Sequence, residues 1–279
     1  MIVDLSQVLK PARQGHYAVG AFNIYNLETI GAVLAAADEL RSPVILALGE
    51  RYLKNFPIRA ISAITTVLAS DSRVPVALHL DHAQKIESIE QAIAAGFTSV
   101  MIDGSKLSLE ENIAITKKAV ALARPRNVTV EAELGRIVRT GVAASDLFTD
   151  PEEARQFMEE TGVDALAVAV GTVHGLYKGA PTLDLERLTR IAGKVSVPLV
   201  LHGGSGLPDH LIKSAIRIGV AKLNINTEVS IQGVNAVRGF LETKGDENTR
   251  LEELMVEARG SMVQVVKKYI EFFGSVGKI

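Results

Sequence analysis

Short apolar runs recur along the chain and are separated by longer amphipathic stretches. Eight such runs, each four to six residues long and rich in Ala, Val, Ile and Leu, show little alternation of polar and apolar positions. Strands of this kind are buried on both faces, which is typical of parallel strands covered by helices. The predicted strands span residues 18–22, 43–48, 75–80, 99–102, 129–134, 165–170, 198–201 and 221–225.

Turn and capping residues divide the chain into repeated units of strand and helix. Three predicted strands are preceded by a glycine, which suits the positive φ that the end of a helix often needs. Ser108 and Asp150 are each followed three residues later by glutamate, the spacing of a capping box. Right-handed units of this kind predict an α/β fold, a (β/α)8 TIM barrel, with an open doubly wound sheet as the alternative. The glycines are Gly96, Gly162 and Gly219.

The length of the chain favours one domain. Its 279 residues suit a single barrel, a fold that commonly takes about 250 residues. A polar stretch over residues 242–250 precedes a last amphipathic helix, which we expect over about residues 251–272. We therefore predict a single TIM-barrel domain over residues 1–279 with this helix as a C-terminal extension.

Composition and charge narrow the functions that the chain can have. The net charge is −2, so there is no basic surplus to attract nucleic acid or acidic lipid. No apolar run reaches the ~20 residues of a membrane span, and the first ten residues lack the pattern of a signal peptide. We therefore expect a cytoplasmic protein with neither a nucleic-acid nor a membrane partner. The absence of cysteine excludes thiol chemistry and leaves histidine and carboxylates as metal ligands.

Histidines are concentrated at the carboxyl ends of the predicted strands, where barrels of this kind carry their active sites. Four of the six histidines lie there, and His82, His174 and His202 follow three different strands. Any one of them alone could be a hydrogen-bonded structural residue. Three imidazoles that converge at a barrel mouth, however, form a zinc site with an open position. His79 lies one strand period before Asp81, so we expect it to be packed or to support a ligand.

Acidic residues and glycine-rich loops accompany these histidines. Asp81, beside His82, can exchange a proton with a substrate oxygen, or it can orient a metal ligand instead. Asp103 and Glu133 each have three possible roles that the sequence does not separate. Each can bind the metal, support a metal ligand, or pair with a basic side chain. Loops after the seventh and eighth strands often bind phosphate in this fold. The corresponding residues here are Gly203, Gly204, Ser205, Gly206 and residues 224–227.

Together these segments resemble class II, metal-dependent ketose-bisphosphate aldolases of the fructose-1,6- and tagatose-1,6-bisphosphate group. The resemblance runs nearly end to end and implies a lyase that cleaves a ketose phosphate to dihydroxyacetone phosphate and an aldehyde. The motifs that carry it are YAVGAFN at 17–23, RSPVIL at 41–46, HLDH at 79–82, GFTSVMID at 96–103, VEAELG at 130–135, GTVHG at 171–175, LHGG at 201–204, NINTE at 224–228 and FGS at 273–275.

The resemblance implies roles for the residues at the strand ends. His82, His174 and His202 would bind the catalytic zinc ion, which acts as a Lewis acid on the oxygens of dihydroxyacetone phosphate. Asp81 would give a proton to the aldehyde oxygen during condensation. Two further acids match positions that hold a displaced metal in the family, namely Asp103 and Glu133.

The same resemblance implies a phosphate site with a monovalent cation, Na⁺ or K⁺, near it. Arg259 would bind a distal phosphate, in some members across a subunit boundary, and Lys178 is a further candidate contact. A homodimer or homotetramer is usual in the family, and the last helix is a plausible interface. The residues that would hold the substrate are Asn23, Gly175, Gly203, Gly204, Ser205, Asn224, Asn226 and Thr227.

The loop after Arg136 departs from the family pattern. Members usually continue with a Gly-Gly pair and a longer acidic loop that supplies the base for removing the C–H proton. Here the loop is shorter, and Asp146 is its only carboxylate. Asp146 is therefore a candidate replacement for that base; alternatively, the protein acts on a different ketose or has only a weak activity. Glu50, Arg51 and Lys106 also depart from the pattern, so the sequence leaves the sugar open.

Three other functions remain as alternatives. The missing loop acid favours a catalytically impaired barrel that binds a sugar phosphate without turnover. A Schiff-base aldolase needs a buried lysine at a strand end, but the sixth predicted strand has none and Lys222 opens the eighth. Many metal-dependent hydrolase barrels carry a His-x-His pair on the first strand, where this chain has Phe22, Asn23 and Ile24.

Overall fold

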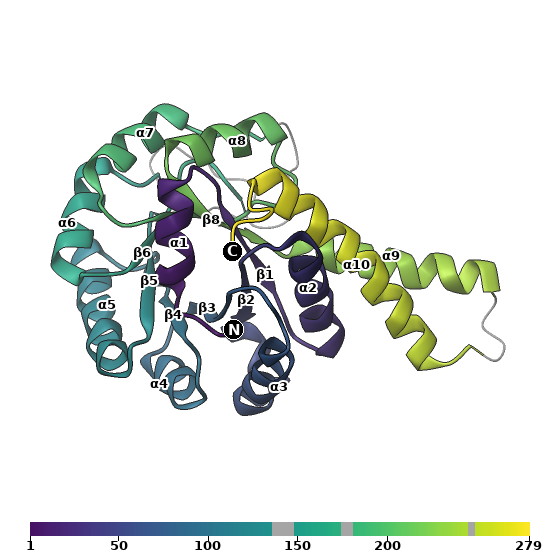
Figure 1. The fold of residues 1–279 in the computed structure, drawn as a ribbon. Coiled ribbons are helices and arrows are strands. Elements are labelled where there is room, and N and C mark those ends of the chain that lie inside the picture. The colour runs from purple at the N-terminus through teal and green to yellow at the C-terminus, as the bar shows by residue number, and fades with distance from the viewer. Residues whose placement is uncertain (136–147, 174–180, 245–248) are drawn as a thin grey trace.

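Eight parallel strands form a closed barrel in which neighbours in sequence pair with each other and the last strand pairs with the first. The computed structural model describes residues 1–135, 148–173, 181–244 and 249–279. The closed barrel confirms the predicted fold and excludes the open sheet (Figure 1). The strands are β1 (Val19–Asn23), β2 (Val44–Gly49), β3 (Val76–Ala83), β4 (Ser99–Ile102), β5 (Thr129–Leu134), β6 (Ala165–Val168), β7 (Leu199–Leu201) and β8 (Val220–Ile225).

Ten helices in the described parts of the chain accompany the barrel: one follows each of the eight strands, one precedes β1, and one follows the helix after β8 (Figure 1). They are α1 (Leu5–Gln14), α2 (Leu27–Leu40), α3 (Ile58–Ser70), α4 (Ile86–Ala94), α5 (Leu109–Ala123), α6 (Pro151–Thr161), α7 (Leu185–Lys194), α8 (Asp209–Ile218), α9 (Thr227–Lys244) and α10 (Leu251–Phe273), with short 3₁₀ turns η1 (Glu50–Tyr52) and η2 (Arg124–Arg126). Ser108 and Glu111 form the predicted capping box of α5, and Asp150 caps α6 through two backbone N–H groups. The three glycines expected before strands all have positive φ.

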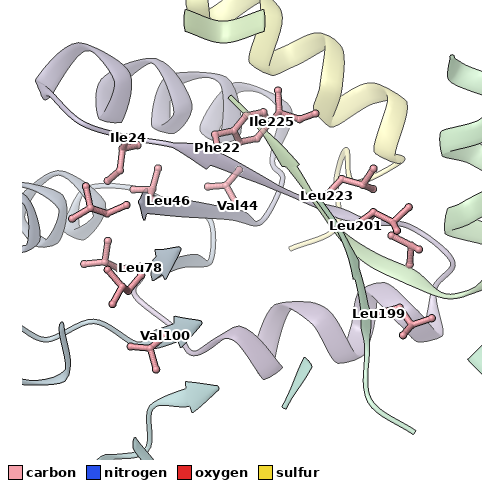
Figure 2. Close-up of a cluster of buried hydrophobic side chains, with 14 of the residues drawn as sticks. Phe22, Ile24, Val44, Leu46, Leu78, Val100, Leu199, Leu201, Leu223 and Ile225 are labelled. Atoms are coloured by element: carbon pink, nitrogen blue, oxygen red, sulfur yellow. The ribbon is translucent and has the colours of Figure 1, made fainter. Parts of the chain in front are cut away.

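Two apolar layers stabilise the barrel. The outer layer lies between the strands and the helices and consists of large side chains such as Phe22, Leu46 and Leu78 (Figure 2). Full burial of a side chain of this size contributes about 1.5–3 kcal/mol. The inner layer is made of smaller side chains that pack with α1, whose Leu5 N–H donates to Thr129 Oγ1 at the start of β5. Because α1 closes the amino end of the barrel, the carboxyl end is left for the site.

β3 continues past its predicted end and carries a bulge. Its pairing with β4 shifts register between Leu80 and Ala83, and His82 has a φ of 51°. A regular strand sends consecutive side chains to opposite faces, whereas a bulge re-aims one of them. The irregularity therefore allows Asp81 and His82, neighbours in sequence, both to face the barrel mouth.

α9 and α10 pack side by side and project from the barrel (Figure 1). α10 also packs on α2, where Arg259 lies over Gly31, since a Cβ placed on that glycine would be 3.0 Å from Arg259 Nε. Arg259 is therefore packed against a helix and does not line the hollow at the carboxyl ends of the strands. Among the helices in the described parts of the chain, none combines the length and the hydropathy that a membrane crossing requires.

Candidate active site

A hollow of about 1250 Å³ opens at the carboxyl ends of the strands, where this fold places catalytic residues. Acidic and histidine side chains form its buried floor, and Arg51, Lys54, Lys85 and Lys106 lie exposed at its rim. The hollow thus brings together side chains that are far apart in the sequence. The predicted site residues that line it are Asn23, Asp81, His82, Asp103, Glu133, His202, Gly203, Ser205, Asn224, Asn226 and Thr227.

Asp81 is held from both sides by amide groups. Asn23 Nδ2 donates to Asp81 Oδ2 and Asn224 Nδ2 donates to Oδ1, each over 3.0 Å, and Asp81 is only 4% exposed. Burial alone would raise the pKa of Asp81, but the positive charges of His82 and its neighbours outweigh burial and hold that pKa below its usual value. Asp81 is therefore an ionised carboxylate with a fixed orientation, a group that can accept a proton from a substrate hydroxyl.

Two overlapping sets of side chains can hold a metal ion. The ligand atoms of Asp81, His82 and His202 lie within 4.8 Å of one another, and so do those of His82, Asp103 and Glu133. The rings of His82 and His202 have centroids 4.4 Å apart. Glu133 Oε2 is buried, has no hydrogen-bond partner among the described residues and lies 3.5 Å from His82 Nδ1. Imidazoles and carboxylates around a buried, unsatisfied oxygen are a donor set that suits zinc.

The charges around His82 also fit a bound cation. His82 Nδ1 lies 3.0 Å from Asp103 Oδ2, while Asp103 Oδ1 accepts hydrogen bonds from the backbone N–H and the hydroxyl of Ser105. Burial alone would lower the pKa of His82, but the negative charges of Asp81, Asp103 and Glu133 raise it to about 9. Burial raises the pKa of Glu133 to about 8. A metal ion favours the deprotonated form of both groups and would take the place of these protons.

A second charged layer lies beneath the floor. Lys222 and Glu131 are both fully buried, and Lys222 Nζ lies 2.7 and 2.9 Å from the two carboxylate oxygens of Glu131. Glu131 Oε1 also lies 3.2 Å from His202 Nε2. His79 Nδ1 lies 2.8 Å from Ser99 Oγ, and burial together with the charge of Lys222 lowers the pKa of His79 to about 3. His79 is therefore a neutral group packed inside the barrel.

The loops after β7 and β8 face the hollow from one side. Ser205, Asn226 and Thr227 line it, and Thr227 is the first residue of α9. The amino end of a helix offers unpaired N–H groups and a positive dipole, which together suit a phosphate. The Gly204 N–H donates to the Asn224 carbonyl oxygen over 3.2 Å, which joins the loop after β7 to the end of β8.

Comparison with known proteins identifies the family. Residues 3–278 match the family model described as fructose-bisphosphate aldolase class-II. The chain belongs to this family. It is an aldolase, and therefore a lyase, in agreement with the resemblance noted in its sequence.

Similar proteins share the whole length of this aldolase. The chain is 44% identical to a fructose-bisphosphate aldolase of Thermus caldophilus, with 100% of each chain covered. It is 43% identical to a 6-phospho-5-dehydro-2-deoxy-D-gluconate aldolase of Halalkalibacterium halodurans, with 99% of this chain and 98% of the relative covered. Among solved structures, the YdjI aldolase of Escherichia coli K12 is 38% identical, with a TM-score of 0.91 over 100% of this chain and 99% of the other.

Some predicted site residues of the aldolase lie outside the described residues. Val173, which directly precedes one of them, is described, and its backbone oxygen lies close to Gly203. The chain thus passes close to the loop after β7 at Val173. The residues concerned are His174, Gly175, Lys178 and Asp146.

Gly203→Ala is expected to destabilise the aldolase by about 2 kcal/mol or more, the scale of a left-handed backbone strain combined with overpacking. Gly203 has a φ of 68°, and an added Cβ would lie 2.2 Å from the Val173 carbonyl oxygen. Gly193→Ala is the matched control, because its Cβ would meet no atom within 4 Å and alanine favours a helix by up to about 1 kcal/mol. Urea denaturation of both variants measures the difference, and equal stabilities would contradict the expected clash.

The buried pair of Lys222 and Glu131 has no role in the site predicted from the sequence. A signal was present, because Glu131 precedes Glu133 by two positions and Lys222 precedes Asn224 by two. Residues two apart on a strand point to the same face, so each charged residue lies directly beneath a residue of the hollow. The partnership across the barrel, from β5 to β8, could be found only in three dimensions.

Proposed function

We propose that this aldolase catalyses the zinc-dependent, reversible aldol cleavage of a ketose phosphate to dihydroxyacetone phosphate and an aldehyde. The observation that carries the proposal is the position of Asp81, a carboxylate fixed by two amides beside a cluster of metal-binding side chains. With fructose- or tagatose-1,6-bisphosphate as substrate, the aldehyde is glyceraldehyde 3-phosphate.

The proposed zinc ligands are His82, His174 and His202. When bound, zinc supplies a Lewis acid that polarises the substrate oxygens next to the reacting carbon. The grouping of the ligand atoms of His82 and His202 supports this set. Asp103 and Glu133 provide a second position for the metal or steady the His82 ring, since His82 Nδ1 lies 3.0 and 3.5 Å from them.

Asp81 moves the proton of the substrate hydroxyl in this proposal. In cleavage it accepts the proton from the hydroxyl on the carbon that becomes the aldehyde, and in condensation it returns that proton to the aldehyde oxygen. Its low pKa keeps it ionised at neutral pH, and Asn23 and Asn224 hold both oxygens in place. In condensation a second group removes the C–H proton of dihydroxyacetone phosphate, and in cleavage it returns that proton to the carbon; Asp146 is our candidate for this group.

The phosphate of the dihydroxyacetone half is proposed to bind at the loops after β7 and β8. The backbone of Gly203, the hydroxyl of Ser205 and the amino end of α9 at Thr227 support this position, and Gly204 is a further proposed contact from the same loop. Anchoring a remote phosphate aligns the reacting carbon with Asp81. Further proposed contacts are Gly175, Lys178 and a monovalent cation, Na⁺ or K⁺.

Basic side chains at the opposite rim favour a substrate with a second anionic group. Arg51, Lys54, Lys85 and Lys106 follow β2, β3 and β4, whereas the phosphate loops follow β7 and β8 across the barrel. A substrate that spans the floor between them directs its distal end toward these cations, which bind phosphate or carboxylate well. Fructose bisphosphate has a phosphate there. The gluconate-derived substrate in the name of the Halalkalibacterium relative has a carboxylate.

Arg51→Gln is expected to raise the KM for glyceraldehyde 3-phosphate in condensation about tenfold or more, since a charged hydrogen bond contributes about 1.5–3 kcal/mol. Arg51 lies over the ring of Tyr52 at 4.7 Å and donates to its hydroxyl over 2.5 Å, so its place at the rim is defined. The KM for uncharged glyceraldehyde should not change. Arg59→Gln, at an exposed position on α3, is the control, and equal effects on both aldehydes would remove Arg51 from anion recognition.

The proposed function is tested by assaying zinc-loaded protein with three candidate substrates. These are fructose-1,6-bisphosphate, tagatose-1,6-bisphosphate and 6-phospho-5-dehydro-2-deoxy-D-gluconate, each coupled to detection of triose phosphate. We expect turnover that EDTA abolishes and zinc restores, and the ratio of the rates assigns the sugar. Absence of turnover with all three would reject these substrates and favour another phosphorylated ketose or an impaired barrel.

We also propose a homodimer or homotetramer in the cytoplasm, where sugar phosphates are metabolised. The projecting pair α9 and α10 supports an interface, because Ile231, Val234 and Val256 expose 40%, 55% and 71% of their surface. Light scattering on the purified protein measures the assembly. A monomer at all concentrations would contradict this part of the proposal.

A further inference from the structure

A lysine sealed inside the barrel takes no part in the chemistry proposed above. Lys222 is 0% exposed and lies on β8, where its register partners on the neighbouring strands are Val19 and Val200. An ammonium group in such a place is strongly unfavourable unless it is paired and hydrogen-bonded. A buried lysine therefore needs a negatively charged partner, and its position in the barrel needs an explanation.

Glu131 is the partner. Both of its carboxylate oxygens lie within 2.9 Å of Lys222 Nζ, and it is 0% exposed as well. A buried ion pair of this kind is often no more stabilising than apolar side chains of similar volume. Stability alone therefore does not explain why two charges occupy the middle of an apolar barrel. The explanation must lie in the contacts that the pair makes with neighbouring groups.

The pair reaches the floor of the hollow through His202. Glu131 Oε1, which accepts from Lys222, also lies 3.2 Å from His202 Nε2, and His202 is 1% exposed. An ionised carboxylate only accepts hydrogen bonds, so His202 Nε2 is the donor in this contact. Donation from Nε2 places the lone pair of the neutral ring on Nδ1, which is the nitrogen through which such a histidine binds a metal.

His79 limits the movement of Lys222 from the other side. Its Nε2 lies 3.5 Å from Lys222 Nζ, and its Nδ1 lies 2.8 Å from Ser99 Oγ. Side chains from β3, β4, β5 and β8 thus form one connected, buried network beneath the floor, joined to His202 directly after β7. Such a network leaves the His202 ring little freedom to rotate or to change its tautomer.

We propose that Lys222 and Glu131 are positioning residues that hold His202 in the orientation and tautomer needed to bind zinc through Nδ1. The inference rests on the proposed function only in taking His202 as a metal ligand. The proposed role also argues against a Schiff base at Lys222. The Lys222 amine is paired with Glu131 beneath the floor, and Lys222 does not line the hollow. Carboxylate contacts to the second nitrogen of a metal-binding histidine orient the ring and raise its affinity for the metal.

The test compares zinc affinity, measured by competition with a chromophoric chelator, with the visible spectrum of the cobalt-substituted protein. The main variant is the double substitution Glu131→Leu and Lys222→Met, which removes both charges together with the acceptor for His202 Nε2 and leaves no buried charge unpaired. We expect zinc binding about 10–100-fold weaker than in the wild type, the usual effect of losing such a contact. The cobalt absorption bands should also change, because the His202 ring is no longer fixed.

Ser42→Ala is the control that separates a general loss of folding stability from a specific effect on zinc binding. It removes a buried hydrogen bond of 2.8 Å between Ser42 Oγ and Ser275 Oγ, at the opposite end of β2 from the site. It should lower the melting temperature and leave the zinc affinity and the cobalt spectrum unchanged. A double variant that binds zinc with wild-type affinity and spectrum would overturn the proposal.

Two measurements on the wild type keep the proposal testable if the variants do not fold. Nitrogen-15 NMR of the zinc-free protein should show His202 protonated at Nε2, and protonation at Nδ1 alone would overturn the assignment. Borohydride treatment with substrate should leave Lys222 unlabelled, and labelling there would overturn its positioning role. Neither measurement requires turnover, so a failure of the proposed aldol cleavage is detected separately in the coupled assay.

Discussion

Asp81→Ala is expected to lower the rate of aldol cleavage by about 10²–10⁴-fold, the usual contribution of a positioned acid or base. The wild-type carboxylate is ionised, only 4% exposed and held by Asn23 and Asn224. Alanine removes the proton acceptor and leaves the two amides in place. We therefore expect the loss in kcat, while zinc content measured by atomic absorption stays at the wild-type level.

Zinc content decides between the two roles open to Asp81. Its carboxylate lies within 4.8 Å of the ligand atoms of His82 and His202, so it is also placed to bind a metal itself. Loss of zinc together with turnover would make Asp81 a ligand, and near-wild-type cleavage would remove it from proton transfer. Asp71→Ala, at an exposed position after α3, should change neither quantity.

The barrel could be predicted from the sequence because its signals are local and repeated. Each strand is an apolar run, and the helix ends are marked by glycines and by caps such as Ser108 and Asp150. Once the fold is known, its carboxyl end is the place for catalytic groups. His82 and His202 meet there, with ring centroids 4.4 Å apart, although 119 residues lie between them in the sequence.

The parts of the site that could not be predicted depend on tertiary structure. The bulge at the end of β3 brings Asp81 and His82 to the same side, whereas strand periodicity would have separated them. The contact of Asn23 with Asp81 joins two strands through a side-chain amide. A lysine near the start of a strand reads as a surface residue, and only the closed barrel shows that Lys222 points inward to Glu131.

His202→Ala is expected to lower the affinity for zinc by about 10²-fold or more. Zinc binding to a four-ligand site contributes about 10–16 kcal/mol, so one ligand accounts for roughly 3 kcal/mol. Catalysis should fall with the bound metal and recover in part when zinc is raised. His210→Ala, at an exposed position on α8, is the control and should bind zinc as the wild type does. Chelator competition on both variants gives the comparison.

The same measurement on His82→Ala and His174→Ala tests the complete ligand set. If all three histidines bind the metal, the three variants should weaken zinc binding to a similar extent. Unchanged binding in His174→Ala would instead indicate that Asp103 or Glu133 completes the site, since both carboxylates lie within 4.8 Å of a ligand nitrogen of His82. In that case Glu133→Gln should lose the metal, because it would remove a charged ligand whose Oε2 is buried without a hydrogen bond among the described residues.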